Sequence, residues 1–321
     1  MASELQAIYR QASEELAAVD STMRQAVSTL TPSLQEAALQ FIAAGGKRLR
    51  PLLIILASKL GSADSQQVVT AAAALELVHL GSLVHDDIVD ESPLRRGRPS
   101  ANATYGNKVA VLLGDFFFAR SLNLARAAGV ETVKVISDVI SSLVEGELQQ
   151  LERRYDLTIT EAEYWERIRC KTAAFIGECC RLGALYSPGN PLAPEALHTY
   201  GLNLGLAYQI KDDLLDFTGA MQTVGKPTKH DLHDGIITLP VIHALKFHPR
   251  RDEISNLISS RVDYDLTPVL ACMQEAGSLT FAEERAAEFI AKAKASLAEA
   301  PEHEAKAALV SIADFVLNRV S

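Results

Sequence analysis

Several features that would place a protein in a known class are absent from this 321-residue sequence. The four cysteines, Cys170, Cys179, Cys180 and Cys272, form no Cys-x-x-Cys pair, so we expect buried free thiols in a reducing compartment. No apolar run approaches the ~20 residues of a membrane span. The N-terminal segment MASELQAIYRQ lacks the apolar core of a signal peptide. These absences predict a cytoplasmic protein with at most peripheral membrane contact.

An excess of basic residues is also missing. The net charge is −9 at pH 7, from 31 Lys and Arg against 40 Asp and Glu. Because nucleic-acid-binding proteins carry basic stripes, this balance argues against a nucleic-acid partner. An anionic substrate stays compatible with it, because metal ions and a local cluster of Arg and Lys can invert the field inside a cleft.

Strand patterns, linkers and repeats are lacking as well. Apolar residues recur at helical spacing along nearly the whole chain, without alternating runs, Gly/Ser linkers or 30–50-residue repeats. Hydrophobic residues make up 48% of the chain, which is enough for a sizeable core. We therefore expect one all-α domain over 1–321, a bundle of about a dozen helices around a central cavity. The predicted helices cover 3–27, 33–44, 50–60, 65–91, 105–128, 131–154, 160–186, 193–218, 237–247, 264–276, 280–299 and 302–318.

Three of these helices have recognisable N-terminal signals. Asp64, Thr160 and Thr280 are suitable N-cap residues. Glu163 and Glu283 each follow a threonine by three residues, so both pairs predict capping boxes.

Against this background, the pattern Asp-Asp-x-x-Asp occurs twice, each time within an apolar helical stretch. The first carboxylate cluster is Asp86, Asp87 and Asp90, and the second carboxylate cluster is Asp212, Asp213 and Asp216. On a helix, the first and last aspartates of each pattern lie one turn apart on the same face, where like charges repel. Oxygen ligands of this kind suit hard cations such as Mg²⁺. The two clusters therefore predict metal binding at a shared cavity.

Basic residues accompany the clusters at loops and helix ends. The segment Gly45-Gly46-Lys47-Arg48-Leu49-Arg50-Pro51 joins a glycine pair to three cations, and Arg95 and Arg96 follow the first cluster. Lys171-Thr172 and Lys226 lie elsewhere on apolar segments or near glycine. Arg and Lys at such positions suit phosphate groups. Together with metal-binding carboxylates, they are what a diphosphate ester requires.

The stretches GGKRLRP, LVHDDIVDESPLRRGRP, KTAAFIGECC and YQIKDDLLDFTG…GKP, in this order, resemble the trans-prenyltransferase (polyprenyl diphosphate synthase) family. The likeness spans about residues 40–245. Within the family it is greatest to large catalytic subunits of bacterial heptaprenyl diphosphate synthases. The resemblance implies the isoprenoid synthase fold and a magnesium-dependent, head-to-tail condensation of isopentenyl diphosphate onto an allylic diphosphate.

The resemblance also implies a role for each matching residue. Three Mg²⁺ ions per active site are expected, held directly by Asp86, Asp90 and Asp212. Asp87, Asp213 and Asp216 act as further ligands or anchors, and Lys171 joins the six aspartates in the catalytic set. Isopentenyl diphosphate is expected to contact Lys47, Arg50, His79 and Arg96, and the allylic diphosphate Arg95, Lys171, Thr172, Gln209 and Lys226. Ile236 stands where many members carry a lysine, which reduces the expected contacts to the allylic diphosphate.

Product length is predicted from the residues that precede the first cluster. Ala74, Val78, Gly81 and Ser82 lie on roughly one helical face and are small, so they leave room for a growing tail. We expect a long all-trans product in the hexaprenyl to decaprenyl range, heptaprenyl favoured, for quinone side chains. Two alternatives are open: Gly81 and Ser82 allow close helix packing, or the enzyme makes a shorter geranylgeranyl or farnesyl product.

Other classes of protein are compatible with parts of the sequence. Glu76 with His79 and Glu195 with His198 fit the Glu-x-x-His spacing of di-iron helical bundles. His230 and His233 could form a zinc pair, although a solvated loop is the preferred interpretation. Terpene cyclases share the expected fold but have a different second metal motif. A non-catalytic subunit is disfavoured because all six aspartates are present; we expect a homodimer, or a heteromer with a small regulatory subunit.

Overall fold

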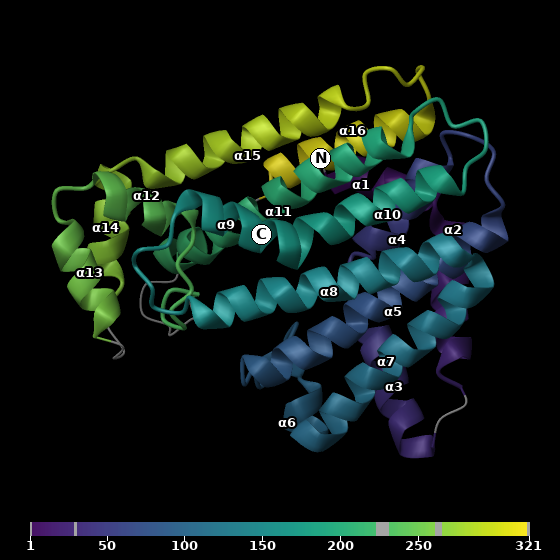
Figure 1. Ribbon diagram of the computed structural model, residues 1–321, viewed down its shortest axis with the longest axis horizontal. Coiled ribbons are helices and arrows are strands. Elements are labelled where there is room, and N and C mark those ends of the chain that lie inside the picture. The colour runs from purple at the N-terminus through teal and green to yellow at the C-terminus, as the bar shows by residue number, and fades with distance from the viewer. Residues whose placement is uncertain (1, 29–30, 223–230, 261–264, 320–321) are drawn as a thin grey trace. The chain divides into compact units, whose positions relative to one another are not determined.

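The computed structural model describes residues 2–28, 31–222, 231–260 and 265–319, most of which are helical (Figure 1). This confirms the predicted all-α class. The helices are α1 Ala2–Gln11, α2 Ser13–Ala26, α3 Pro32–Ala44, α4 Leu49–Ser58, α5 Ser65–Val89, α6 Ala101–Tyr105, α7 Asn107–Ala128, α8 Val130–Glu152, α9 Glu161–Ile168, the π-helical turn η1 Arg169–Ala173, α10 Ala174–Leu185, α11 Pro194–Gln222, α12 Leu239–Phe247, α13 Arg251–Ser259, α14 Thr267–Glu275, α15 Ser278–Ala295 and α16 Glu304–Leu317.

Backbone contacts divide the chain into two compact units. Unit 1 contains Met1–Ser141, Glu178–His198 and Leu297–Ser311, and unit 2 contains Ser142–Gly177, Thr199–Ser296 and Ile312–Ser321. The expected single domain over 1–321 stays a prediction.

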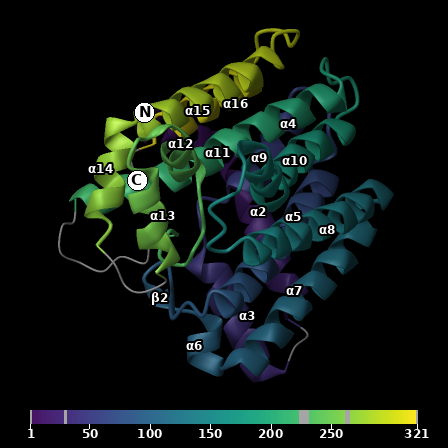
Figure 2. The same cartoon turned by 60° about the vertical axis from the view of Figure 1, so that its left-hand side comes forward.

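Helix α5 forms the core of unit 1. Asp64 caps its N-terminus, as predicted, by accepting a hydrogen bond from the backbone N–H of Gln66 (2.9 Å). Residues 71–78 are all buried, and α5 lies beside α7 along much of its length (Figures 1 and 2). Among the described helices, α5 is the one that length and composition would allow to cross a membrane. Its burial within unit 1 is that of a core helix.

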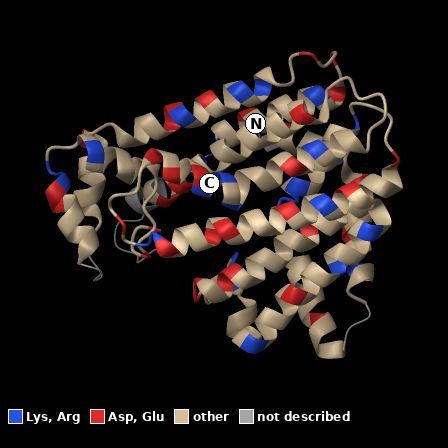
Figure 3. Ribbon diagram, viewed as in Figure 1, with Lys and Arg blue, Asp and Glu red and all other residues tan. Residues whose placement is uncertain are grey.

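In unit 2, α12, α13 and α14 gather beside the N-terminal end of α15 (Figure 1). Basic and acidic residues are interspersed along α15 (Figure 3), whereas Ala282, Ala286 and Ile290 are buried. Helix α15 is therefore amphipathic.

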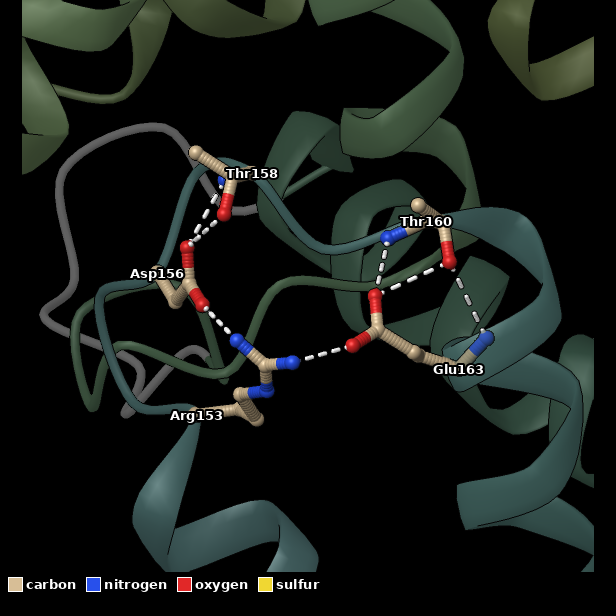
Figure 4. Close-up of polar contacts among 5 residues, drawn as sticks. All are labelled: Arg153, Asp156, Thr158, Thr160 and Glu163. Carbon is tan, nitrogen blue, oxygen red and sulfur yellow. Dashed lines mark hydrogen bonds and ion pairs between the residues drawn. The ribbon is translucent and has the colours of Figure 1, made fainter.

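The turn between α8 and α9 is braced by polar contacts. The predicted capping box of Thr160 and Glu163 is confirmed, with the backbone N–H of Thr160 donating to Oε2 of Glu163 (2.9 Å). Figure 4 shows Arg153 between Asp156 and Glu163, forming an ion pair with each. Asp156 also accepts from the backbone N–H of Thr158 (2.9 Å). These contacts give residues 153–163 a defined path.

Two predicted helices are interrupted. The helix expected over 3–27 breaks at Ala12, where the Ser13 hydroxyl donates to the carbonyl of Arg10 (2.8 Å) and competes with the helical bond pattern. The helix expected over 160–186 contains the π-helical turn η1, which a neighbouring helix approaches closely at a glycine. A Cβ added at Gly146 of α8 would lie 2.9 Å from the Lys171 nitrogen.

Other elements differ at their boundaries. The helix expected over 105–128 is divided into α6 and α7 by Gly106, the C-cap residue of α6, which has a φ of +79°. Helix α13 was not predicted. Helix α15 already begins at Ser278, so the capping box expected at Thr280 does not form. Strands β1 Leu94–Arg95 and β2 Arg98–Pro99, also not predicted, pair as a hairpin because Arg96 and Gly97 both adopt positive φ, as a tight two-residue turn requires.

Candidate active site: two carboxylate clusters

The first carboxylate cluster lies at the C-terminal end of α5 in unit 1. Helix α5 ends at Val89, and Asp90 is its C-cap residue, whose backbone N–H donates to the carbonyl of Asp86 (2.8 Å). Asp86 and Asp90 are therefore one helical turn apart, as the spacing predicts. Asp90 is exposed and Asp86 half-buried, so both belong to the accessible end of the helix.

The middle aspartate, Asp87, is held differently. Its side chain is fully buried, and Oδ1 accepts from Nε of Arg95 (2.8 Å) and from a second nitrogen of the same guanidinium. Burial raises the pKa of Asp87, and Arg95 opposes this rise. Oδ2 is buried and has no hydrogen-bond partner among the described residues. The structure thus pairs Arg95, expected at the allylic diphosphate, with a carboxylate of the first cluster.

A set of cations surrounds His79 in unit 1. The pKa of His79 lies well below its ordinary value because of burial, and then because of the positive charges of Arg50, Arg96, Arg48 and Arg95. His79 is therefore neutral at pH 7, inside a positive field. Arg50 and Arg96, two of the other residues expected at isopentenyl diphosphate, are thus near enough to His79 to lower its pKa by their charge. Lys47 is exposed, and its carbonyl accepts from the Tyr9 hydroxyl.

The structure shows why glycine and arginine occupy two positions of the segment 45–51. A Cβ added at Gly46 would lie 2.5 Å from Nη2 of Arg96, so glycine lets the guanidinium approach the backbone. Arg48 donates to Glu76 (2.9 Å), Asp20 (3.1 Å) and the carbonyl of Ile42 (2.6 Å). Arg48 is thus a structural cation, and Glu76 is occupied by it.

A cavity of about 370 Å³ lies beside the β1–β2 hairpin in unit 1. Leu80, Leu83 and Phe41 contribute apolar walls, and Arg95, Arg96 and Arg98 contribute cations. The cavity therefore combines apolar surface with positive charge next to the first cluster.

The expected chain-length residues have different surroundings. Ala74 and Val78 are fully buried, and the Ser82 hydroxyl donates to the carbonyl of His79 (3.0 Å). A Cβ added at Gly81 would lie 2.9 Å from the ring of Phe118 on α7. At Gly81 the structure favours the packing alternative, because the space beside the glycine is filled. The role of these residues in product length stays a prediction.

The second carboxylate cluster lies on α11 in unit 2. Asp213 is buried, and its two oxygens accept from the Tyr164 hydroxyl (2.7 Å) and from Nε2 of Gln209 (2.9 Å). The Thr172 hydroxyl in turn donates to Oε1 of Gln209 (2.7 Å). Burial raises the pKa of Asp213 to about 6. Both clusters therefore have a buried, anchored middle aspartate, and Asp212, like Asp90, is exposed.

A further carboxylate, which sequence reasoning missed, lies beside this cluster. The backbone N–H of Asp231 donates to Oδ2 of Asp216 (3.1 Å). Burial first, and then the charges of Asp213 and Asp216, raise the pKa of Asp231 to about 7. The positive charge of Lys171 opposes this rise, and Nζ of Lys171 lies 2.9 Å from Glu147 Oε2.

The loop that carries Asp231 is fastened to the α8–α9 turn. The Tyr155 hydroxyl donates to the carbonyl of His233 (2.8 Å), and the Tyr155 N–H donates to that of Gly235 (2.8 Å). Arg154 donates to the carbonyl of Asp234 (2.6 Å). His233 is therefore part of a fastened loop. His230, its partner in the alternative zinc pair, and Lys226 lie outside the described residues.

Oxygen donors of this type fit a hard cation. In the described part of the chain, no three His, Cys, Asp or Glu side chains converge as a complete metal-binding group. Mg²⁺ commonly uses one or two carboxylates and takes water and substrate phosphates as its other ligands. The accessible Asp86, Asp90 and Asp212 suit that mode. The di-iron alternative is not supported, since Glu76 is paired with Arg48 and His198 lies 3.5 Å from Glu178.

Comparison with known proteins gives a consistent result. A family model described as polyprenyl synthetase matches residues 31–274. The chain is 35% identical over 316 residues to heptaprenyl diphosphate synthase component 2 from Geobacillus stearothermophilus, covering 98% of this chain and 99% of that protein. Other relatives are named octaprenyl and short chain isoprenyl diphosphate synthases.

Solved structures agree over nearly the full length. A decaprenyl diphosphate synthase from Rhodobacter capsulatus is 34% identical, with a TM-score of 0.92 and coverage of 99% of both chains. A polyprenyl synthase from Caulobacter crescentus, complexed with calcium and isoprenyl diphosphate, is 35% identical, with a TM-score of 0.91 and coverage of 99% and 98%.

Proposed function

Because the chain belongs to the polyprenyl synthetase family and is a prenyltransferase, we propose that it catalyses one particular condensation. Isopentenyl diphosphate would be added head-to-tail to an allylic diphosphate, in a magnesium-dependent reaction that gives a long all-trans polyprenyl diphosphate. The motifs indicate a likeness to the catalytic subunits of heptaprenyl diphosphate synthases. The Geobacillus relative, named heptaprenyl diphosphate synthase component 2, supports this likeness.

The observation that carries this proposal is the repeated design of the two clusters. In each, a buried middle aspartate is anchored by a donor, Arg95 for Asp87 and Tyr164 for Asp213. The flanking carboxylates stay accessible, which is the arrangement a cation needs when its remaining ligands come from substrate and water. We infer that an anchored middle aspartate also limits the movement of the flanking carboxylates.

We assign the following roles to the residues of the proposed site. Asp86, Asp90 and Asp212 would hold three Mg²⁺ ions with the allylic diphosphate, and Lys171, Thr172, Gln209 and Lys226 would contact the same diphosphate. Lys47, Arg50, His79 and Arg96 bind isopentenyl diphosphate. When bound, magnesium supplies Lewis-acid stabilisation of the negative charge on the departing diphosphate. The double bond of isopentenyl diphosphate attacks the allylic carbon, and the released diphosphate is the base that takes the proton.

We favour a heptaprenyl product within the hexaprenyl to decaprenyl range, for quinone side chains. Ala74 and Ser82 are small, whereas the space at Gly81 is filled by Phe118. The relatives' names range from short chain to decaprenyl, so a geranylgeranyl or farnesyl synthase is the alternative. We place the reaction in the cytoplasm, with peripheral membrane contact for release of the apolar product.

We also propose an assembly, either a homodimer or a heteromer with a small regulatory subunit. Helix α7 carries the exposed apolar side chains Val111, Leu112 and Leu122, at 42%, 61% and 45% exposure, which a partner chain would cover. The word "component" in the Geobacillus relative's name supports the second form.

The test is incubation of the purified chain with isopentenyl diphosphate, farnesyl diphosphate and Mg²⁺, followed by sizing of the products. The reaction is run alone and with candidate partner chains. Long prenyl products that disappear with a chelator support the proposal. Products of 20 carbons or fewer would favour the alternative, and no product in any combination would contradict it.

A further inference from the structure

The residue of interest is Arg319, which follows the end of α16 in unit 2. Its Nη1 lies 3.0 Å from Oδ1 of Asp212, and its guanidinium lies 4.9 Å from the centre of the Tyr208 ring. Tyr208 precedes Asp212 by four residues on α11, so the two share one helical face. The Arg319 side chain is 15% exposed, whereas that of Asp212 is 48% exposed. The cation is thus enclosed between an aromatic ring and an accessible carboxylate.

The backbone around Arg319 is held in place. The Asn318 N–H donates to the carbonyl of Asp314 (3.1 Å), and the Asn318 side chain donates to the same carbonyl (2.8 Å). Asp314 also forms an ion pair with Lys294 of α15. Arg319 therefore reaches Asp212 from an anchored turn.

The surroundings explain why a cation is favourable here. Asp212, Asp213, Asp216 and Asp231 bring four carboxylates into one region of unit 2, and their mutual repulsion contributes to the raised pKa of Asp231. Lys171 forms its ion pair with Glu147. Arg319 supplies positive charge to Asp212, the most exposed member of the cluster.

We propose that Arg319 is the resident counter-cation of the second carboxylate cluster, and that it lowers the affinity of Asp212 for a divalent cation. A guanidinium at 3.0 Å and a metal ion compete for the same carboxylate oxygen, and their like charges repel. Metal binding then requires Arg319 to give up its contact. The inference rests on the proposed function, in which Asp212 holds metal.

The chain offers a closely matched control. Arg285 of α15 lies 2.6 Å from a carboxylate, that of Glu288, and 5.3 Å from the centre of an aromatic ring, that of Phe281. Arg285→Gln removes the same charge and the same type of contacts from unit 2 without altering Asp212.

The experiment is a titration of the full chain with Mn²⁺ in the absence of substrate, with free Mn²⁺ measured by electron paramagnetic resonance. Partly exposed ion pairs contribute about 1 kcal/mol or less. We therefore expect Arg319→Gln to tighten Mn²⁺ binding by up to about fivefold, and Arg285→Gln and Arg319→Lys to stay close to the wild type. Thermal melting should show a lower metal-free midpoint for Arg319→Gln and a larger rise with Mn²⁺.

Asp212→Asn distinguishes the role of Asp212 as a metal ligand from the role of Arg319 as its counter-cation. If this variant loses Mn²⁺ binding while Arg319→Gln binds as the wild type does, or more weakly, the role of Arg319 is overturned and the metal site survives. If Asp212→Asn binds Mn²⁺ like the wild type, the assignment of Asp212 as a metal ligand fails, and the role of Arg319 fails with it.

Discussion

The Tyr164 hydroxyl donates a 2.7 Å hydrogen bond to Oδ2 of Asp213, and both side chains are buried. The two residues are 49 positions apart in the chain. This bond holds the middle aspartate of the second cluster in place, as Arg95 holds Asp87 in the first, and we infer that it also steadies Asp212 beside it.

Tyr164→Phe removes this donor without changing the shape of the side chain. We expect it to lower stability by about 1 kcal/mol or more, because a buried carboxylate oxygen loses its partner. We also expect roughly tenfold lower kcat/KM, with a higher Mg²⁺ requirement, because Asp212 is less well oriented.

The matched control is Tyr186→Phe, which also removes a buried hydroxyl, one that contacts Oγ1 of Thr132 (2.7 Å) in unit 1. It should lower stability comparably and leave kcat/KM unchanged. Equal loss of activity in both variants would show that Tyr164 acts through general stability alone.

Gly46→Ala tests the positive site around His79. The added methyl group would displace the Arg96 guanidinium, which lies 2.5 Å from the Cβ position. Because a bond to a charged group contributes about 1.5 kcal/mol, the KM for isopentenyl diphosphate should rise about tenfold. The KM for the allylic substrate, measured in the same assays, is the internal reference; an equal rise in both would argue against a site-specific effect.

Ser82→Phe tests the prediction about product length. An aromatic side chain one turn before Asp86 should narrow the path of the growing tail and shorten the products. Ser82→Ala should leave the lengths unchanged. Gly81→Phe is a poorer probe than Ser82→Phe. Phe118 already fills the space beside Gly81, so we expect this variant to misfold. If Ser82→Phe gives products of wild-type length, the prediction that Ser82 influences product length is wrong.

The α8–α9 turn predicts a pH dependence of stability. Hydrogen bonds lower two pKa values: that of Glu163, chiefly through the Thr160 N–H, and that of Asp156, chiefly through the Thr158 hydroxyl. A carboxylate whose pKa is depressed in the folded state stabilises it above its unfolded pKa. This contribution is lost as the pH falls through the folded pKa.

Glu163→Gln should therefore lower the urea midpoint at pH 7, and the difference from the wild type should shrink at an acid pH below the lowered pKa of Glu163, where the carboxyl group is protonated. Glu161→Gln, a change in the same helical turn outside the capping box, is the control. A difference between Glu163→Gln and the wild type that is the same at both pH values would contradict the assignment.

The sequence was sufficient for the features that depend on local spacing. The two Asp-Asp-x-x-Asp patterns have the predicted helical spacing, with Asp90 as the C-cap residue of α5. Asp64 and Thr160 cap their helices as predicted, because these signals involve residues within one turn. The family resemblance is confirmed by the family model over residues 31–274.

Features that depend on distant residues were missed. Single residues such as Tyr164, Asp231 and Arg319 have no local pattern, and they approach the second cluster through tertiary packing. The turn η1 is closely approached at Gly146 and Gly205, which are distant in the sequence; a Cβ there would lie 2.9 Å from Lys171 N and 2.5 Å from Ala173 Cα. The hairpin lies between two predicted helices, and its strands of two residues each are too short to show an alternating pattern.

The most direct test of the central claim, that both carboxylate clusters serve one prenyl transfer, is the rate of product formation in Asp86→Asn, Asp212→Asn and the double variant. We expect each single change to lower the rate by about 10²-fold or more. The double variant should be far less impaired than the product of the two effects, because residues acting as a unit are not additive. A near-wild-type rate in either single variant would contradict the account.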